Sequence, residues 1–177
     1  MIRTILILIF SLTASTGFSQ ETEGNSEEKE RRHRITFMPS HTYVKVDVDN
    51  KQKWKSFASY GLNYDYWIKE NIAIGLHTDL VGASFAVTRF DDKQILERKR
   101  PVAVIGVFLY KLKFGLTPVV GLGVEIDDED QLALLQLGLE YGVEFGKGWE
   151  VGANATFDAK VEVYDSITFG LSLSKKL

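Results

Sequence analysis

The strongest structural signal in this 177-residue chain is the stretch LALLQLGLEYGVEFGKGWEVGANATFDAKVEV, from Leu132 to Val163. Apolar residues occupy every second position from 135 to 145, and again from 151 to 163 after Gly146-Lys147-Gly148. Period two is the periodicity of a β-strand, and Gly-Lys-Gly suits a tight hairpin. Both runs are longer than the ~5–6 residues of an ordinary strand. Long strands with one apolar face, and a second face of glycine and charged residues, predict a β-barrel whose apolar side meets lipid.

The same pattern places eight strands along the chain. They are 35–46, 56–68, 72–81, 102–112, 117–126, 135–145, 151–163 and 166–174. Pro39 predicts a bulge or a strand end, because proline cannot donate a hydrogen bond to the ladder. The orientation of the first strand stays open, as does that of 102–112, which is apolar on both faces. We therefore predict an all-β fold, an eight-stranded antiparallel up-and-down transmembrane β-barrel over residues 35–177.

The connections between these strands differ in length. Those at 69–71, 113–115 and 146–148 are short, whereas those at 47–55 and 83–100 are longer. Short periplasmic turns and longer outer loops are the asymmetry expected of outer-membrane barrels. Aromatic residues near the short turns predict an interfacial girdle there. These residues are Trp67, Tyr110, Phe114, Phe145 and Trp149.

The N-terminal part of the chain predicts export. Arg3, the apolar run Ile5–Leu12 and the small residues before a cleavage site near Gln20 have the layout of a signal peptide, which we expect at 1–19. The alternative is a membrane anchor, but a spanning helix needs about 20 apolar residues and this run is well short of that. The segment 20–34 is almost entirely charged or polar, which favours a disordered lead-in over a periplasmic contact arm.

Composition excludes several classes of function. The chain contains no cysteine, which excludes a lipid-anchored cysteine, a thiol nucleophile and a zinc–thiolate site. An exported protein without disulfides needs another source of stability, and closed strand pairing inside a membrane supplies one. The net charge of −3 is too mild to indicate a nucleic-acid or polyanion partner. We expect no cofactor and no metal.

Four segments carry a resemblance to a known family: YGLNYDYWIKENIAIGLHTDLV (Tyr60–Val81), TPVVGLGVEI (Thr117–Ile126), LLQLGLEYGVEFGKGWEVG (Leu134–Gly152) and ITFGLSLSKKL (Ile167–Leu177). In these segments the chain resembles the small eight-stranded outer-membrane proteins typified by the OmpA transmembrane domain and OmpX. It differs in ending with Lys-Lys-Leu, where such barrels usually end in Phe or Trp. The resemblance implies a monomer in the outer membrane of a Gram-negative bacterium. Its partners would be outer-membrane lipid, lipopolysaccharide and the barrel-assembly machinery.

Three residues are candidates for catalysis. His77 and Asp79 share a face of one predicted strand, and Ser84 follows shortly after. A histidine polarised by an acid can act as a general base for a serine hydroxyl, and some small outer-membrane barrels modify lipid A. His–Asp spacing of this kind is common in strands by chance, so we expect no catalytic residue. A metal held by His77, Asp79 and a further carboxylate is a weaker alternative.

The polar faces of the predicted strands place more acids than bases inside the barrel. The predicted interior polar network consists of Asp65, Asp79, Glu125, Glu140, Glu144, Glu150, Asp158, Lys160 and Glu162. One interpretation is a path for cations. The other, which we favour, is a hydrogen-bonded plug, because buried charges must be paired or neutralised. Bases from the two strands of open orientation would supply the missing partners.

Arg98-Lys99-Arg100 closes the longest predicted outer loop. One interpretation is a contact with lipopolysaccharide phosphates, whose oxygens match the fork of an arginine. The other is a solvated loop end. The sequence does not choose between them.

Three functions are compatible with these patterns. The first is a non-enzymatic integral outer-membrane protein with a structural or surface-interaction role, and the second is a lipid-modifying enzyme that uses His77. The third is a lipocalin-like periplasmic barrel whose apolar face surrounds a ligand. Glycine on the polar face favours the lipid-facing barrel, because a narrow lumen needs small residues. We therefore expect the first function.

Overall fold

The computed structural model describes residues 31–177, apart from 49–50, 91–92 and 129. The predicted signal peptide and most of the predicted lead-in lie outside the described residues. The strands are β1 (His33–Val48), β2 (Lys51–Lys69), β3 (Ile72–Val81), β4 (Ser84–Thr88), β5 (Ile95–Lys99), β6 (Val102–Tyr110), β7 (Leu116–Ile126), β8 (Gln131–Phe145), β9 (Trp149–Lys160) and β10 (Tyr164–Lys176). In the described part of the chain no helix has the length and apolar character needed to cross a membrane.

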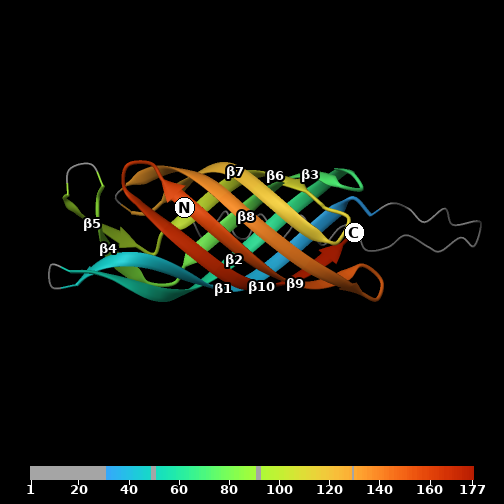
Figure 1. Ribbon diagram of the computed structural model, residues 1–177, viewed down its shortest axis with the longest axis horizontal. Coiled ribbons are helices and arrows are strands. Elements are labelled where there is room, and N and C mark those ends of the chain that lie inside the picture. Colours follow the sequence, from blue (N-terminus) through green and yellow to red (C-terminus); the bar gives the residue numbers. More distant parts are fainter. Residues whose placement is uncertain (1–30, 49–50, 91–92, 129) are drawn as a thin grey trace, which may run out of the picture. The chain divides into compact units, whose positions relative to one another are not determined.

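Eight of these strands form a closed antiparallel barrel (Figure 1). Neighbours follow the order β1-β10-β9-β8-β7-β6-β3-β2, and β1 pairs with both β2 and β10, which closes the sheet. Closure leaves no open edge whose backbone groups would face lipid without partners. The predicted fold class is confirmed.

The two ends of the barrel carry different connections. The short-turn end carries the connections β2–β3, β6–β7 and β8–β9, and the long-loop end carries β1–β2, β3–β6, β7–β8 and β9–β10. Only the connection β3–β6 is long, so the predicted asymmetry rests on this one loop. The predicted long loop at 47–55 is wrong, because β1 and β2 pair across it as far as Val48↔Lys51. The predicted loop at 83–100 contains a separate two-stranded sheet, β4–β5.

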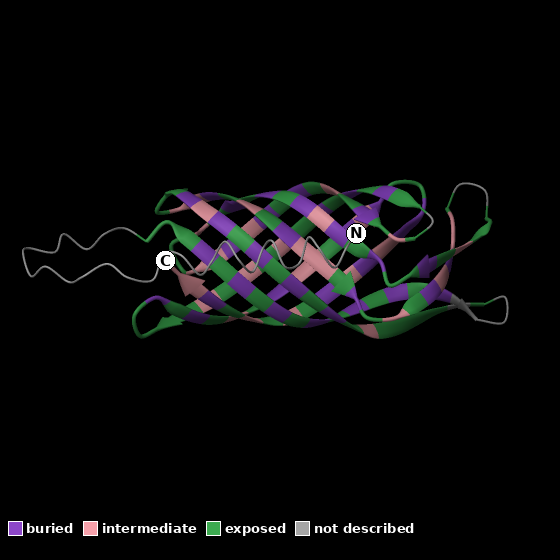
Figure 2. Cartoon of the chain, turned by 180° about the vertical axis from the view of Figure 1, so that it is seen from behind, coloured by how far each residue is buried: buried purple, intermediate pink, exposed green. Residues whose placement is uncertain are grey.

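Buried and exposed residues alternate along the strands of the barrel (Figure 2), which means that successive side chains point to its interior and to its outside. Leu137 is 49% exposed, whereas the adjacent Gln136 is 4% exposed and lies inside. Leu122 and Val124 of β7 are likewise exposed on the outer face. The apolar face is therefore the outer face. The lipocalin-like alternative is wrong, because it requires the apolar face to line the interior.

The structure orients the two strands that the sequence left open. β1 directs Arg34 and small polar side chains into the interior. β6 is apolar on both faces because its inward residues join an apolar wall of the lumen. That wall consists of Trp67, Ala73, Ala103, Ile105, Val107, Leu109, Val119 and Leu134. Gly121 of β7 makes room for this wall, since a Cβ at that position would lie 2.7 Å from Ile105 Cγ2.

Pro39 lies in the middle of β1, so the prediction of a bulge or strand end there is wrong. The pairs between β1 and β10 stop at Phe37↔Leu173 and resume at Ser40↔Gly170 in the same register. Pairing between β1 and β2 continues through the proline without interruption. The ladder on one side therefore maintains the strand where proline lacks a donor for the other.

Trp67 is not part of an outer aromatic girdle, so the prediction for this residue is wrong. It has the same parity as Asp65 in β2, points inward and lies beneath the guanidinium of Arg34, whose central carbon is 5.5 Å from the ring centroid. The other predicted girdle residues are exposed near the short turns: Tyr110, Phe114, Phe145 and Trp149.

Candidate functional site

The half of the interior nearer the short-turn end is organised by Arg34 of β1. Its Nε donates to Asp65 Oδ2 at 2.9 Å, and its terminal nitrogens lie 2.8 Å from Glu140 Oε2 and 3.2 Å from Glu150 Oε1. Asp65 also bonds to His77, with 3.0 Å between Oδ1 and Nε2. One buried cation thus joins β1 to three other strands. It balances carboxylates that would be costly to bury alone.

The half nearer the long-loop end is organised by Lys160 of β9. Its Nζ lies 3.6 Å from Glu125 Oε2 and 3.5 Å from Asp158 Oδ2, and it donates to Ser166 Oγ at 2.5 Å. Gln136 Nε2 donates to the second oxygen of Asp158 at 2.9 Å. Lys160 is therefore the shared counterion of two carboxylates from different strands.

Arg98 of β5 extends this ionic group into the long-loop end. Its Nη2 lies 3.0 Å from Glu125 Oε1, and its Nη1 lies 2.9 Å from Asp127 Oδ2. Tyr164 Oη donates to the same Glu125 oxygen at 2.6 Å. The Arg98 side chain is 0% exposed. The sheet β4–β5 is consequently anchored to the barrel by a buried ion pair.

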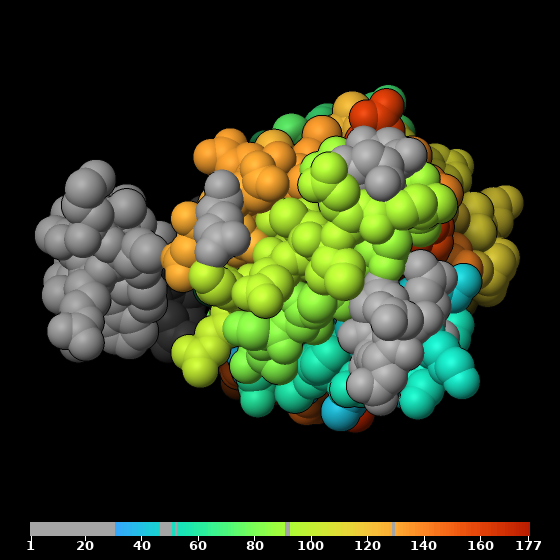
Figure 3. All heavy atoms as spheres, turned by 90° about the vertical axis from the view of Figure 1, so that its left-hand side faces the viewer, coloured from blue at the N-terminus to red at the C-terminus, as the bar shows by residue number. Residues whose placement is uncertain are grey.

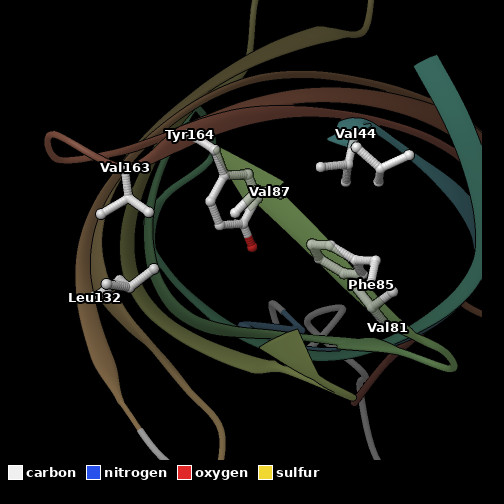
Figure 4. Packing of buried hydrophobic residues seen from close by; sticks show 8 residues of the cluster. Val44, Val81, Phe85, Val87, Leu132, Val163 and Tyr164 are labelled. Carbon is white, nitrogen blue, oxygen red and sulfur yellow. The ribbon is translucent and has the colours of Figure 1, made fainter. Parts of the chain in front are cut away.

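An apolar layer lies beside this anchor and belongs to the sheet and the barrel together. It consists of Val44, Val46, Val81, Phe85, Val87, Leu132, Val163 and Tyr164 (Figure 4). Phe85 of β4 stacks on Phe57 with 5.1 Å between ring centroids and meets Tyr164 edge-on at 5.9 Å. Seen from this end, the yellow-green segment that contains β4 and β5 covers the centre of the barrel (Figure 3). The long-loop end is therefore closed by a small apolar core of its own.

Six of the eight predicted interior acids face the lumen: Asp65, Asp79, Glu125, Glu140, Glu150 and Asp158. Asp79 Oδ1 is buried without a hydrogen-bond partner. Glu144 lies exposed at the short-turn rim and binds Lys176 Nζ at 2.7 Å. The interior prediction for Glu162 is wrong, since this residue is exposed in a turn with φ of 63°. The apolar alternation continues in the sequence to Val163, but the backbone turns after Lys160.

The three candidate catalytic residues are not brought together. His77 is buried and bonds to Asp65 rather than to Asp79. Ser84 is exposed at the start of β4, where it pairs with Lys99. A serine–histidine mechanism needs the two side chains within hydrogen-bond reach. This arrangement does not provide that contact.

The run Arg98-Lys99-Arg100 divides between two environments. Arg98 is turned inward, so a phosphate contact is wrong for this residue. Alternation along β5 accounts for the exposure of Lys99, whereas Arg100 follows the end of the strand and has a positive φ of 49°. Lys99 and Arg100 are exposed, and the Lys99 amide donates to Asp127 Oδ2 at 3.3 Å.

Sequence reasoning missed Arg34 and the inward role of Arg98. The predicted lead-in includes Arg34, although β1 already begins at His33. Extending the predicted strand by one residue would have brought Arg34 into the barrel on the same face as Thr36 and Thr42, although the direction of that face was open. No comparable signal exists for Arg98, because the five residues of β5 are too short for a decisive periodicity. Within the described residues, no group of three or more histidine or acidic side chains has a geometry that could hold a metal.

Comparison with known proteins shows the fold. No protein-family model matches the chain, and no curated protein matches its sequence. The solved structure of Ail, the attachment invasion locus protein of Yersinia pestis, matches with a TM-score of 0.53 at 11% identity, covering 83% of this chain and 99% of Ail. Neisserial surface protein A matches with 0.53 at 8% identity, covering 82% and 97%. The outer membrane protein OprG of Pseudomonas aeruginosa matches with 0.50 at 11% identity, covering 82% and 97%.

The chain therefore has the fold of the small eight-stranded outer-membrane β-barrels. Ail was also solved in complex with the heparin analogue sucrose octasulfate, and this structure matches with a TM-score of 0.52 at 11% identity over 83% of this chain and 99% of that one.

Proposed function

We propose that the protein is a non-enzymatic integral outer-membrane protein that acts through a surface interaction at its long-loop end. The observation that carries this proposal is the closure of that end by β4–β5, anchored by Arg98 and sealed by an apolar layer. A lumen closed in this way offers solutes no wide path and keeps His77 away from lipid. The polar and aromatic side chains that a partner can still reach lie on the outside of the long-loop end.

The proposed location is the outer membrane of a Gram-negative bacterium, reached by export, signal-peptide cleavage at the end of 1–19 and insertion by the barrel-assembly machinery. The apolar outer face and the closed ladder support it, because both suit lipid surroundings. We propose a monomer surrounded by outer-membrane lipid and lipopolysaccharide. Retention of the protein in outer membranes after a carbonate wash tests the location, and release by the wash would contradict it.

The long-loop end offers a surface suited to an anionic partner. The β1–β2 hairpin carries four exposed lysines: Lys45, Lys51, Lys53 and Lys55. Trp54, which lies among them, is 52% exposed. The net charge of −3 describes the whole chain and therefore does not reveal this local cluster of positive charge. The complex of Ail with a heparin analogue gives independent support for anionic glycans as the partner class.

Binding of heparin, used as a probe, to the protein in neutral detergent micelles tests this proposal. The variant K51Q/K53Q/K55Q should bind at least tenfold more weakly, with a flatter salt dependence, because exposed cations act through screened electrostatics. The variant K69Q/K113Q/K147Q removes the same charge at the short-turn end and should bind as the native protein does. Equal losses in both variants, or no binding by the native protein, would contradict the proposal.

A further inference from the structure

A groove of about 240 Å³ lies on the barrel wall at the long-loop end. Three parts of the chain form it: the β1–β2 hairpin, the residues at the end of β4, and the strands β9 and β10. The side chains that matter for its chemistry are Lys45, Trp54, Phe90, Phe157, Asp165 and Ile167. Most of these side chains belong to the outward rows of their strands, and Tyr164, which also lines the groove, belongs to the apolar layer that closes the interior.

The groove depends on the sheet that closes the lumen. Phe90, just beyond β4, donates its backbone N–H to the carbonyl of Glu162 at 3.2 Å. This bond attaches the end of β4 to the β9–β10 turn and places Phe90 over the barrel wall. Phe85, earlier in β4, contacts Tyr164 from the inside. The sheet therefore reaches across the long-loop end and overhangs the wall, which encloses the groove.

The floor of the groove is part of the lipid-facing surface. Phe157 and Ile167 pair with each other in the β9–β10 ladder, and Phe169 continues the same outward row of β10. Phe169 in turn packs edge-on against Tyr43 of β1, with 6.0 Å between ring centroids. An apolar path thus leads from the groove down the outside of the barrel.

The edges of the groove are polar and carry both signs of charge. Lys45 Nζ lies 5.3 Å from the ring centroid of Trp54, so an ammonium group and an aromatic face are presented side by side. Asp165 contributes a carboxylate on β10. An ammonium binds a phosphate, an exposed aromatic face packs on a sugar ring, and a carboxylate accepts hydrogen bonds from hydroxyl groups.

We propose that this groove binds the phosphorylated sugar head group of an outer-leaflet glycolipid. The phosphate lies at Lys45, the sugar ring lies against Trp54 and Phe90, and an acyl chain follows Phe157 and Ile167 into the bilayer. The volume is below the ~300–1,000 Å³ of sites that enclose a whole small molecule, which fits one part of a larger amphiphile. A soluble polysaccharide would leave the apolar floor without a partner. This inference rests on the proposed function and narrows its partner to one class.

Titration of the protein in phosphatidylcholine nanodiscs with bis-phosphorylated lipid A, followed by native mass spectrometry, tests the inference. The native chain should bind one lipid A saturably. Lys45→Gln should weaken binding about tenfold, which corresponds to ~1.4 kcal/mol, and removal of the lipid A phosphates should have the same effect on the native chain. Lys51→Gln, on the same hairpin outside the groove, should weaken binding much less than Lys45→Gln, and Lys113→Gln at the short-turn end should leave binding unchanged. Trp54→Ala should weaken binding of both the phosphorylated and the dephosphorylated lipid.

Two results would contradict glycolipid binding in the groove while leaving the proposed function intact. One is an equal loss in Lys45→Gln and Lys51→Gln, which would mean diffuse attraction to the whole hairpin. The other is heparin binding without any saturable lipid A binding. Failure to bind either probe would overturn both proposals. Unchanged urea midpoints of the variants establish that they are folded.

Discussion

Arg98 of β5 and Glu125 of β7 form an ion pair, with 3.0 Å between Nη2 and Oε1, although no strand pairing joins these two elements. Tyr164 of β10 donates to the same carboxylate oxygen. Glu125 therefore ties the sheet β4–β5 to two different strands of the barrel wall, β7 and β10. This buried carboxylate acts together with the apolar layer of the long-loop end to hold the sheet in place.

Replacing Arg98 with methionine should release the sheet β4–β5. Removal of one partner of a buried ion pair costs about 3–5 kcal/mol, because the other charge stays buried without compensation. Limited proteolysis of the folded protein should then cleave between β4 and β5 at least tenfold faster, since cleavage follows local opening. The exposed neighbour provides the control: Arg100→Met should leave the rate unchanged. Equal rates in both variants would contradict the anchoring role of Arg98.

Leu137→Arg should be far more destabilising than Gln136→Arg, although the two positions are adjacent. Arginine facing the middle of the bilayer costs about 2–4 kcal/mol in a barrel. At position 136 the arginine points inward, where Asp158 already accepts a hydrogen bond from the native side chain. Urea titration of the protein folded into liposomes measures both losses. The reverse order would mean that the faces of β8 are assigned the wrong way round.

The isolated barrel should give no large, steady conductance in a planar bilayer. An eight-stranded barrel has an interior only just wide enough for its side chains, and here Arg34, Lys160 and Arg98 are paired with the acids around them. A small leak should prefer cations, because acids outnumber bases inside. Exchanging Glu140 and Glu144 for glutamine should lower that preference. A large open pore in single-channel recordings would contradict the closed lumen.

His77→Ala should leave the composition of lipid A unchanged when the protein is overproduced. The imidazole is buried in the lumen and bonds to Asp65, so it meets neither lipid nor Ser84. Mass spectrometry of lipid A from cells with the native protein, the variant and an empty vector makes the comparison. A lipid A species that requires His77 would revive the enzyme hypothesis.

Several features of the fold are encoded in neighbouring residues, and the sequence was sufficient to predict them. The alternation along 135–145 specified both a strand and the direction of each side chain, because a shift of one residue would exchange the two faces. The turn at Gly146-Lys147-Gly148 was equally local, since all three residues adopt positive φ angles of 52°, 43° and 82°. Glycine reaches such angles without strain.

Only the tertiary structure decided which side chains meet inside the lumen. Arg34 and Glu150 are 116 residues apart in the chain, yet their charged atoms lie 3.2 Å apart. Which side chains meet inside a barrel depends on the stagger between all of its strands, and no single strand carries that information. The orientation of β6 could not be predicted from the sequence for a related reason. This strand faces lipid on one side and an apolar wall on the other, so its two faces do not differ in polarity. The direction of β4–β5 depends on Phe85, Val87 and Arg98 finding partners on β1, β7 and β10, which only the closed barrel brings within reach.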